Sequence, residues 1–142
     1  LLSALVFTIK RNKNMNKLII DAANDNIFLM IINNHNIYNI SHENSKTNYE
    51  KLTTLIYDFL KSKGLNLEEI ASLYVNRGPG SFAGIRNSLS IVKAMHFTQK
   101  IDYYCYSFKD FIGEIDIKYE NIPNLCDKFK LKKNLINPIY IS

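Results

Sequence analysis

A glycine-rich stretch, RGPGSFAGIRNSLS at 77–90, is the part of the sequence best suited to chemistry. It places three of the chain's five glycines within seven residues, between an apolar run and a helix-like pattern. A turn of this kind that leads into a helix can hold a phosphate on its backbone amides. It can also let another segment come very close, because glycine lacks a Cβ atom. The question is which of the two the glycines do here.

The spacing of the glycines argues against the known phosphate-binding motifs. A Walker loop needs a lysine after its last glycine, but Gly84 is followed by Ile85. The dinucleotide motif is G-x-G-x-x-G, whereas Gly78, Gly80 and Gly84 give G-x-G-x-x-x-G. Pro79 also removes one backbone donor from the turn. A structural turn is therefore favoured over a phosphate site.

Ser81 is the candidate nucleophile within this stretch. A nucleophile elbow has glycine two positions to either side of the serine, and those positions are Pro79 and Ala83. Ser81 instead stands where the N-cap of the following helix is expected, with its hydroxyl satisfying a free backbone amide. Metal-ligand spacing is absent from the three histidines, His35, His42 and His96. The sequence thus predicts neither a nucleophile nor a metal site here.

Asp21 is the carboxylate with the most suggestive position, at the end of the first predicted strand, KLIIDAA. Phosphotransferases of the actin and sugar-kinase type place a metal-binding aspartate at such a strand end. Those sites normally continue with a threonine or serine, whereas Ala22 and Ala23 follow here. Two interpretations stay open: a vestigial nucleotide or metal site, and a strand-end aspartate that caps the turn toward Asn24.

Five strands are predicted to position these residues. β-Branched and apolar runs place them at 17–23, in two segments within 26–41, at 72–76 and at 101–108. With the helices between them, the order β-β-β-α-β-α-β predicts an α/β fold. Its mixed sheet has three antiparallel strands first, and the later strands arrive through helical crossovers. A short helix near 125–130 and a terminal strand at 138–142 complete the expectation.

Capping residues mark the expected helices. The first long helix is predicted at 48–63, from a Thr47–Glu50 capping box and from Gly64 at its end. The second long helix follows Ser81, and shorter helical turns are expected after Asn66 and Ser107.

The second long helix has two unlike faces. Its large apolar face comprises Phe82, Ile85, Leu89, Val92 and His96, and its neighbouring smaller face comprises Gly84, Ser88, Ile91 and Met95. The smaller face allows another helix to approach closely, with Phe82 as an anchor and Arg86 available for a charge-assisted bond. The alternative is that this face packs inside the domain.

Bulk composition indicates one globular domain without disulfides. The 142 residues carry a net charge of +5, but three basic residues precede Met15 and the rest is nearly neutral. The cysteines, Cys105 and Cys126, lie far apart and are expected to be buried free thiols in a reducing compartment. The apolar start, LLSALVF, is too short to span a bilayer. We therefore expect a cytoplasmic protein with no membrane contact, and residues 1–14 as an extension outside the fold.

The strand KLIIDAA, the strands after it, an amphipathic helix and the stretch VNRGPGSFAGIRNSLSIVKAM together resemble the TsaB family, also called YeaZ-like. The family signature is GRGPGSFTGLR. This chain matches it at Arg77, Gly78, Pro79, Gly80, Ser81, Phe82, Gly84 and Arg86. Ala83 replaces the usual threonine, and Ile85 replaces leucine. The resemblance covers about residues 16–111, and NPIYIS resembles the strand that closes family members.

The resemblance implies an actin-like/ribonuclease H-like domain at 15–112, with 113–142 as a short remnant of a truncated second lobe. It also implies a non-catalytic subunit, without a cofactor or metal of its own. Family members pair with the catalytic subunit TsaD through their long helices, and they work with the ATPase TsaE. The complex places threonylcarbamoyl on the adenosine beside the tRNA anticodon.

Under the same resemblance, the partner interface is expected at the eight matched residues of the signature and at two later ones: Arg77, Gly78, Pro79, Gly80, Ser81, Phe82, Gly84, Arg86, Ser88 and Ile91. A homodimer is a further option, and tRNA would be contacted only indirectly. The alternative function is an ATP-binding phosphotransferase or ATPase-like enzyme of the actin-like superfamily. It is disfavoured because Ala22 and Ala23 lack the hydroxyls that usually follow such an aspartate.

Overall fold

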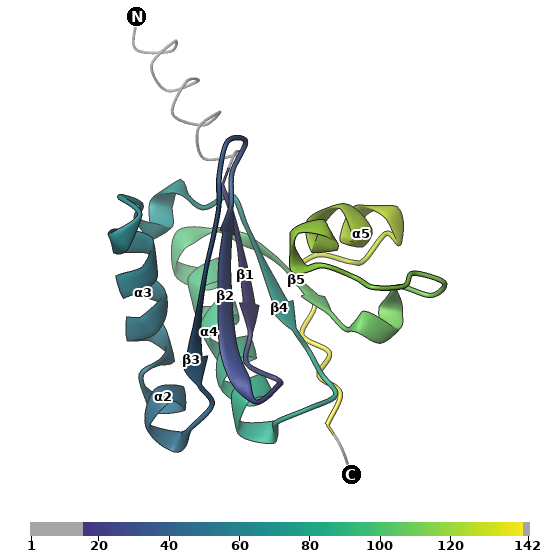
Figure 1. Cartoon of the computed structure of the whole chain (residues 1–142), viewed down its shortest axis with the longest axis horizontal. Coiled ribbons are helices and arrows are strands. Elements are labelled where there is room, and N and C mark those ends of the chain that lie inside the picture. Colours follow the sequence, from purple (N-terminus) through teal and green to yellow (C-terminus); the bar gives the residue numbers. More distant parts are fainter. Residues whose placement is uncertain (1–15, 141–142) are drawn as a thin grey trace, which may run out of the picture.

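A computed structural model describes residues 16–140 and shows one mixed sheet between two unequal layers (Figure 1). The sheet has the strand order β3-β2-β1-β4-β5. The strands are β1 (Lys17–Asp21), β2 (Asn26–Ile32), β3 (Ile37–Glu43), β4 (Ser72–Asn76) and β5 (Asp102–Tyr106).

The pairing of the strands confirms the predicted mixed sheet. β1 pairs antiparallel with β2, and β2 pairs antiparallel with β3. β4 then lies parallel to β1 on its other side, and β5 lies parallel to β4. Since parallel neighbours end at the same edge of a sheet, β1, β4 and β5 bring their carboxyl ends together. Asp21 and the glycine-rich turn both lie at that edge.

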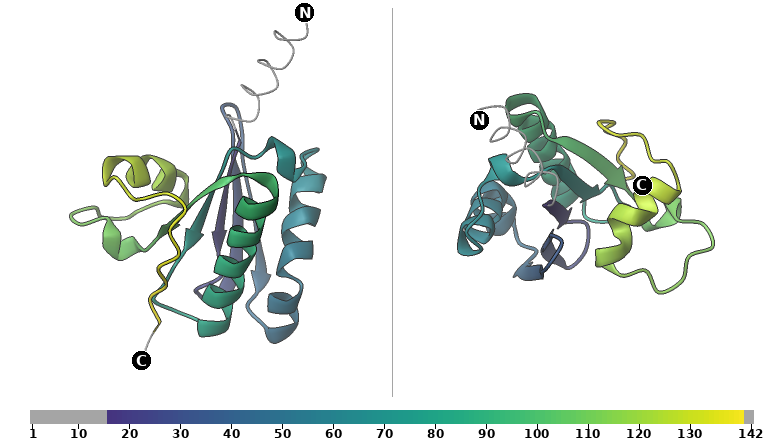
Figure 2. Two further views of the ribbon diagram at one scale, coloured as in Figure 1. Left: turned by 180° about the vertical axis from the view of Figure 1, so that it is seen from behind. Right: turned by 90° about the horizontal axis from the view of Figure 1, so that it is seen from above.

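Helices α2 (Lys46–Glu50), α3 (Leu52–Ser62) and α4 (Phe82–Gln99) cover one face of the sheet (Figures 1 and 2). The prediction of one helix at 48–63 is wrong in two details. The helical segment starts earlier, because the Ser45 hydroxyl, rather than Thr47, caps it by accepting the Asn48 amide at 3.2 Å. It is also interrupted at Lys51, whose backbone leaves helical geometry.

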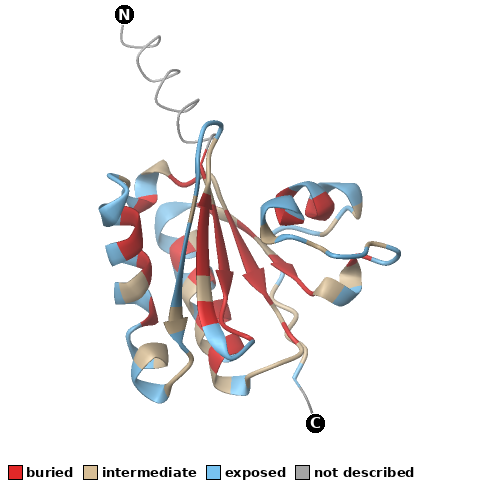
Figure 3. Ribbon diagram, viewed as in Figure 1, coloured by how far each residue is buried: buried red, intermediate tan, exposed pale blue. Residues whose placement is uncertain are grey.

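The opposite face of the sheet is covered by the segment that follows β5. This segment contains the short 3₁₀ turns η2 (Phe108–Asp110) and η3 (Tyr119–Asn121), and then helix α5 (Ile122–Lys128). The predicted helix at 125–130 therefore starts earlier than expected, with Pro123 in its first turn. Figure 3 shows buried residues along the central strands and on the inward sides of α3, α4 and α5.

Each face of the sheet has its own apolar core. The larger core lies under α3 and α4 and includes Leu18, Ile56 and Val75. The smaller core lies under α5 and includes Ile19 and Tyr106. Alternation along a strand explains the division, since successive side chains such as Leu18 and Ile19 point to opposite faces. Both cysteines are buried free thiols, as predicted.

The predictions for the turns and for the ends of the chain are only partly confirmed. Asn66 donates its amide to Glu69 at 3.3 Å in the predicted capping box, which begins a 3₁₀ turn, η1 (Leu67–Glu69). Residues 138–140 form no strand, and 141–142 lie outside the described residues. The predicted extension at 1–14 lies outside them as well. In the part of the chain that the structure describes, no helix has the length and apolarity needed to cross a membrane.

Candidate functional site

The glycines of the turn let its backbone pack directly against the end of β1. A Cβ atom on Gly80 would overlap the carbonyl oxygen of Ala23, and one on Gly84 would overlap the carbonyl oxygen of Ala22. The Ser81 amide also donates to the Ala23 carbonyl at 2.8 Å. The turn thus serves for close approach within the chain, which was one of the two interpretations of its glycines.

Gly78 makes the second close approach, toward residues near the end of the chain. Its φ of 109° lies in a region that other residues rarely adopt, and a Cβ atom there would overlap the Ile139 carbonyl oxygen. The Ile139 amide donates to the Arg77 carbonyl at 2.7 Å. The peptide between Gly78 and Pro79 is cis. The segment around 139 therefore lies against the start of the turn, although it forms no regular strand.

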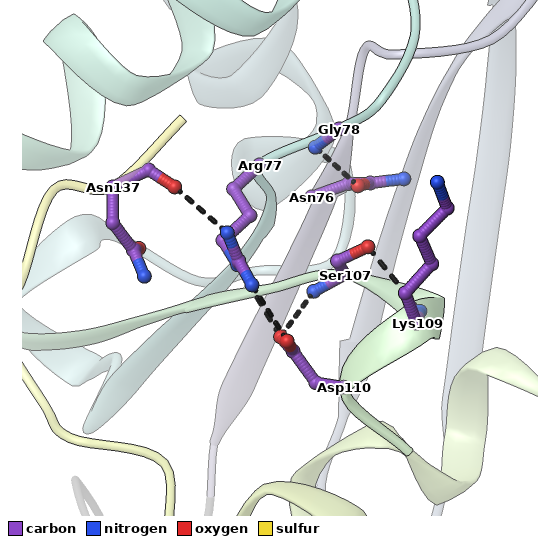
Figure 4. Close-up of polar contacts among 7 residues, drawn as sticks. All are labelled: Asn76, Arg77, Gly78, Ser107, Lys109, Asp110 and Asn137. Atoms are coloured by element: carbon purple, nitrogen blue, oxygen red, sulfur yellow. Dashed lines mark hydrogen bonds and ion pairs between the residues drawn. The ribbon is translucent and has the colours of Figure 1, made fainter. Parts of the chain in front are cut away.

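Arg77 connects three parts of the chain (Figure 4). Its Nη2 lies 2.6 Å from Oδ1 of Asp110, and its Nε donates to Oδ2 of the same residue at 3.3 Å. Its Nη1 donates to the Asn137 carbonyl at 3.0 Å. Only 16% of each charged side chain is exposed. Arg77 was expected at a partner interface, but here it joins the turn to η2 and to the end of the chain.

Ser81 is the N-cap of α4, as predicted. Its Oγ accepts the Gly84 amide at 3.2 Å and lies 2.6 Å from the Tyr49 hydroxyl. Through this pair the start of α4 is attached to α2. The serine hydroxyl is therefore engaged at a helix start, where it satisfies an amide that has no partner within the helix.

Asp21 is fully buried, and four donors of the chain itself surround its carboxylate. Oδ1 accepts the Ala23 amide at 3.0 Å. Oδ2 accepts the Asn24 side chain at 3.2 Å, the Asn76 side chain at 3.1 Å and the Tyr119 hydroxyl at 2.6 Å. Asn76 in turn accepts the Gly78 amide at 2.9 Å, which extends the network into the turn.

The surroundings of Tyr119 keep its hydroxyl protonated, so that it can donate a hydrogen bond. Its ring stacks on Phe28 with the centroids 4.2 Å apart. Burial of the ring, and next the charge of Asp21, raise the pKa of Tyr119 well above its usual range. The neutral hydroxyl is therefore available to stabilise the buried carboxylate. In the described part of the chain, no three His, Cys, Asp or Glu side chains come together in a way that would hold a metal.

The smaller face of α4 requires a correction. Gly84 and Ser88 are both buried, with Gly84 against Ala22 and the ring of Tyr49. The Ser88 hydroxyl donates to the Ile85 carbonyl of its own helix at 3.1 Å. These two positions therefore pack inside the domain, which was the alternative left open by the sequence. Their small size serves the contact of α4 with β1 and α2, so neither residue forms an exposed partner surface.

The exposed part of α4 borders a groove between this helix and α2–α3. The groove has a volume of about 620 Å³. It is lined by Lys46, Tyr49, Glu50, Thr53, Ala83, Arg86, Asn87, Ser90 and Ile91. Of the residues predicted for the interface, Arg86 and Ile91 thus lie at this surface.

Phe82 stands beside the groove with 56% of its surface exposed. Its ring centroid lies 4.7 Å from that of Tyr140, and the Arg86 guanidinium lies 5.5 Å from the Phe82 centroid. Phe82 is exposed, unlike Ile85, Leu89 and Val92, with which the sequence grouped it on one apolar face of the helix. An exposed aromatic ring beside an arginine is typical of protein contact surfaces.

Two members of the Asp21 network were absent from the sequence predictions. Asn76 ends β4, the parallel neighbour of β1, and strand order alone would have placed it beside Asp21. Tyr119 stands 98 residues after Asp21 in a segment without strong periodicity. No local pattern in the sequence marks its role.

Comparison with known proteins gives one family and one fold. The family model described as "TsaD: tRNA N6-adenosine threonylcarbamoyltransferase" matches residues 38–108, half of the chain. Among solved structures, YeaZ from Pseudomonas aeruginosa matches with a TM-score of 0.61 and 18% identity, over 66% of this chain and 44% of that one. A second structure matches with the same score and identity, over 66% and 43%. This second protein is described as an "uncharacterized protein with similarity to peptidase YEAZ from Pseudomonas aeruginosa".

These matches bear on the fold more than on the activity. The chain spans less than half the length of either solved structure, and an identity of 18% establishes a shared fold alone. No match is found among curated proteins. The predicted α/β mixed sheet of the actin-like type is confirmed by the likeness to YeaZ. Because the family model covers the region from β3 to the end of β5, including the glycine-rich turn, the chain belongs to the TsaD family and has a YeaZ-like fold.

Proposed function

We propose that this chain is a non-catalytic subunit that binds a TsaD-type catalytic subunit. The pair would serve the threonylcarbamoylation of the adenosine beside the tRNA anticodon, with a TsaE-like ATPase acting through the complex. The observation that carries the proposal is the environment of the Asp21 carboxylate. Its carboxylate is buried and is surrounded by donors from the same chain.

A carboxylate that binds a metal or assists phosphate transfer must be reachable by its ligand. Asp21 instead receives hydrogen bonds from Ala23, Asn24, Asn76 and Tyr119. Replacing these donors with a metal would require Tyr119 to leave its stacked position on Phe28. The network therefore supports a structural role for Asp21, in line with the missing hydroxyls at Ala22 and Ala23.

The groove between α2–α3 and α4 is the surface that we propose for the partner. It carries charges of both signs, from Lys46, Glu50 and Arg86, together with the apolar side chain of Ile91. Phe82 and Tyr140 add an exposed aromatic pair beside it. Apolar and aromatic residues with a charged border suit a protein partner. A second copy of the chain is the other occupant of this surface that we consider, as a homodimer.

An ATP-binding enzyme of the actin-like superfamily is the competing function. A cavity of about 510 Å³ at the start of α4 is the candidate site for a nucleotide under this alternative. Its lining includes Ser81, Tyr49 and Asn24 but no lysine or arginine, and it includes the carboxylate of Asp25. Such a lining opposes a triphosphate, since phosphate sites rely on cations and free backbone amides. Calorimetric titration of the full chain with Mg-ATP tests this, and tight binding would favour the enzyme.

Co-purification with a TsaD-type catalytic subunit from the same source tests the proposed role. Ser90→Arg puts a long charged side chain into the groove and should weaken the complex on the order of a hundredfold. Thr98→Arg is the matched control. Both residues are exposed on α4, and each hydroxyl donates to the carbonyl four residues earlier at 2.9 Å. Only Ser90 lines the groove.

The two variants separate a docking defect from a folding defect. If the complex forms equally well with Ser90→Arg and Thr98→Arg, the groove is not the docking surface. If the unchanged chain fails to bind the catalytic subunit at all, the proposed function is wrong. If the chain alone is a dimer and Ser90→Arg makes it a monomer, the groove is occupied by a second copy.

A further inference from the structure

A lysine-rich segment begins at the last residue of α5 and continues beyond it, and its lysine side chains lie at the surface. In the sequence KFKLKK at 128–133 the lysines are all exposed, whereas Phe129 and Leu131 pack against the smaller core. The ring of Phe129 lies 5.7 Å from that of Phe111. Because these two apolar side chains point inward, the lysine side chains between and after them point outward.

Asn134 attaches the end of this segment to β5. Its amide donates to the Tyr103 carbonyl at 2.7 Å, and its side-chain oxygen accepts the Tyr103 amide at 2.9 Å. Its side-chain nitrogen donates to Asp102 at 2.9 Å, and Lys133 lies 3.5 Å from the same carboxylate. The segment that carries the lysines is therefore fixed to β5, the strand at the edge of the sheet, and its path is visible in Figure 2.

Lys100 and Phe97 lie at the end of α4, just before β5. Lys100 stands two residues before Asp102, the acidic partner of Lys133. Its ammonium group lies 5.7 Å from the ring centroid of Phe97, which is 78% exposed. An exposed ring among lysines offers a face on which a nucleobase can stack.

Two acidic residues near this surface are engaged, whereas Asp127 is exposed and forms no ion pair with the described residues. Glu114 is paired with Lys128 at 2.6 Å, and Asp102 is paired with Lys133 and bonded to Asn134. Among the described residues, no ion pair involves Lys100, Lys130 or Lys132. These three ammonium groups are therefore available to an external polyanion.

We propose that Lys100, Lys130 and Lys132, with the ring of Phe97, form a direct contact surface for the phosphate backbone of RNA. The choice of RNA rests on the proposed function, because the matched family is described by an activity on tRNA. Lys130 and Lys132 lie outside the groove and outside the matched residues 38–108. The surface thus gives the chain an RNA contact of its own, separate from the contact with a protein partner.

Fluorescence anisotropy with a labelled tRNA transcript and the full chain tests this contact. Binding should weaken steeply between about 50 and about 200 mM salt, because each lysine–phosphate contact releases a counterion. Lys130→Gln/Lys132→Gln should weaken binding several-fold at the lower salt and reduce the log–log salt slope by about 2. Phe97→Ala should weaken binding and leave the slope unchanged, because stacking releases few counterions.

The matched control is Lys61→Gln/Lys63→Gln, which removes the same charge at the end of α3, on the face of the sheet opposite to α5. Unchanged tRNA binding in this control, with a loss in Lys130→Gln/Lys132→Gln, supports the proposal. Equal losses in both variants would overturn it, since net charge alone would then explain binding. Preferential binding to phosphatidylserine vesicles over tRNA would also overturn it, and would indicate a membrane surface.

Failure of this inference is distinguishable from failure of the proposed function. Lys130→Gln/Lys132→Gln should still co-purify with the catalytic subunit, because neither lysine lines the groove. A complex that forms while tRNA binding is unaffected by this variant would contradict the RNA surface alone.

Discussion

The hydroxyl of Tyr119 donates a 2.6 Å hydrogen bond to Oδ2 of Asp21, across 98 residues of sequence. This contact joins the segment after β5 to the end of the central strand β1. It also supplies the buried carboxylate with a donor that no residue near Asp21 in the sequence provides. Removing this contact therefore measures how much β1 and the segment after β5 stabilise each other.

Tyr119→Phe should lower the free energy of unfolding by about 2 kcal/mol, because a buried carboxylate loses a hydrogen bond while the aromatic stacking is kept. Urea denaturation measures the change. Tyr57→Phe is the control, since 46% of Tyr57 is exposed and its hydroxyl is accessible to water. Equal effects of the two substitutions would show that the bond to Asp21 contributes no net stability.

Gly84→Ala should destabilise the chain by about 3 kcal/mol or more, because the added methyl would collide with the Ala22 backbone, which cannot move freely within the sheet edge. Gly64→Ala provides the comparison. Gly64 has a φ of 70° but open space around it, so only the backbone cost of about 1 kcal/mol applies. Thermal and urea unfolding of both variants measure the difference. A Gly84→Ala chain as stable as Gly64→Ala would contradict the described close approach.

Arg77→Lys should release the end of the chain locally, because lysine cannot keep both the contacts with Asp110 and the bond to the Asn137 carbonyl. Hydrogen exchange at the Ile139 amide is the measurement, with at least about tenfold faster exchange expected. Lys128→Gln removes the exposed pair with Glu114, which should contribute less than about 1 kcal/mol. Exchange at Ile139 that responds equally to both changes would argue against a specific role for Arg77.

Stability should fall as the pH rises above about 9. Burial raises the pKa of the Cys105 thiol and of the Cys126 thiol from 9.0 to about 12. Burial likewise raises the pKa of Tyr74 from 10.0 to about 12. The folded chain therefore retains protons that the unfolded chain releases. The free energy of unfolding consequently decreases as the pH rises from the pKa values of the unfolded chain to the higher pKa values of the folded chain.

The size of this pH effect can be measured by urea denaturation at about pH 8 and at about pH 10, where each thiol should account for about 1 kcal/mol of the loss. The variant Cys105→Ala/Cys126→Ala should keep only the smaller loss due to the buried tyrosines, whose pKa values are also raised by burial, among them Tyr74, Tyr106 and Tyr119. An unchanged pH dependence in that variant would mean that the thiols do not titrate as the structure implies.

Local patterns predicted most of the sheet and the role of Ser81. β-Branched and apolar runs were sufficient to predict β1 to β5, since every strand has such a run of its own. The capping role of Ser81 followed from its place before a helical run. Spacing also distinguished the glycine-rich turn from the Walker and dinucleotide motifs, because it compares positions within a few residues.

Contacts between distant segments were beyond that kind of reasoning. The small residues Gly84 and Ser88 fit an approaching neighbour, but the sequence does not say whether that neighbour is a partner or the chain itself. The structure places Ala22 and Tyr49 there. Arg77 was likewise expected to face outward, and only the fold brings Asp110 and Asn137 to it. Tyr119 lies in a weakly patterned segment, so its bond to Asp21 had no local signal.

The late position of Tyr119 has a consequence for biosynthesis. A ribosome completes β1 long before it adds the residues that cover the smaller core, from η2 to α5. Until then the nascent chain has Ile19, Tyr74 and the carboxylate of Asp21 on a sheet face without its cover. Exposed apolar surface and open strand edges invite aggregation. The smaller core and the bond to Asp21 are completed only after α5 has been synthesised.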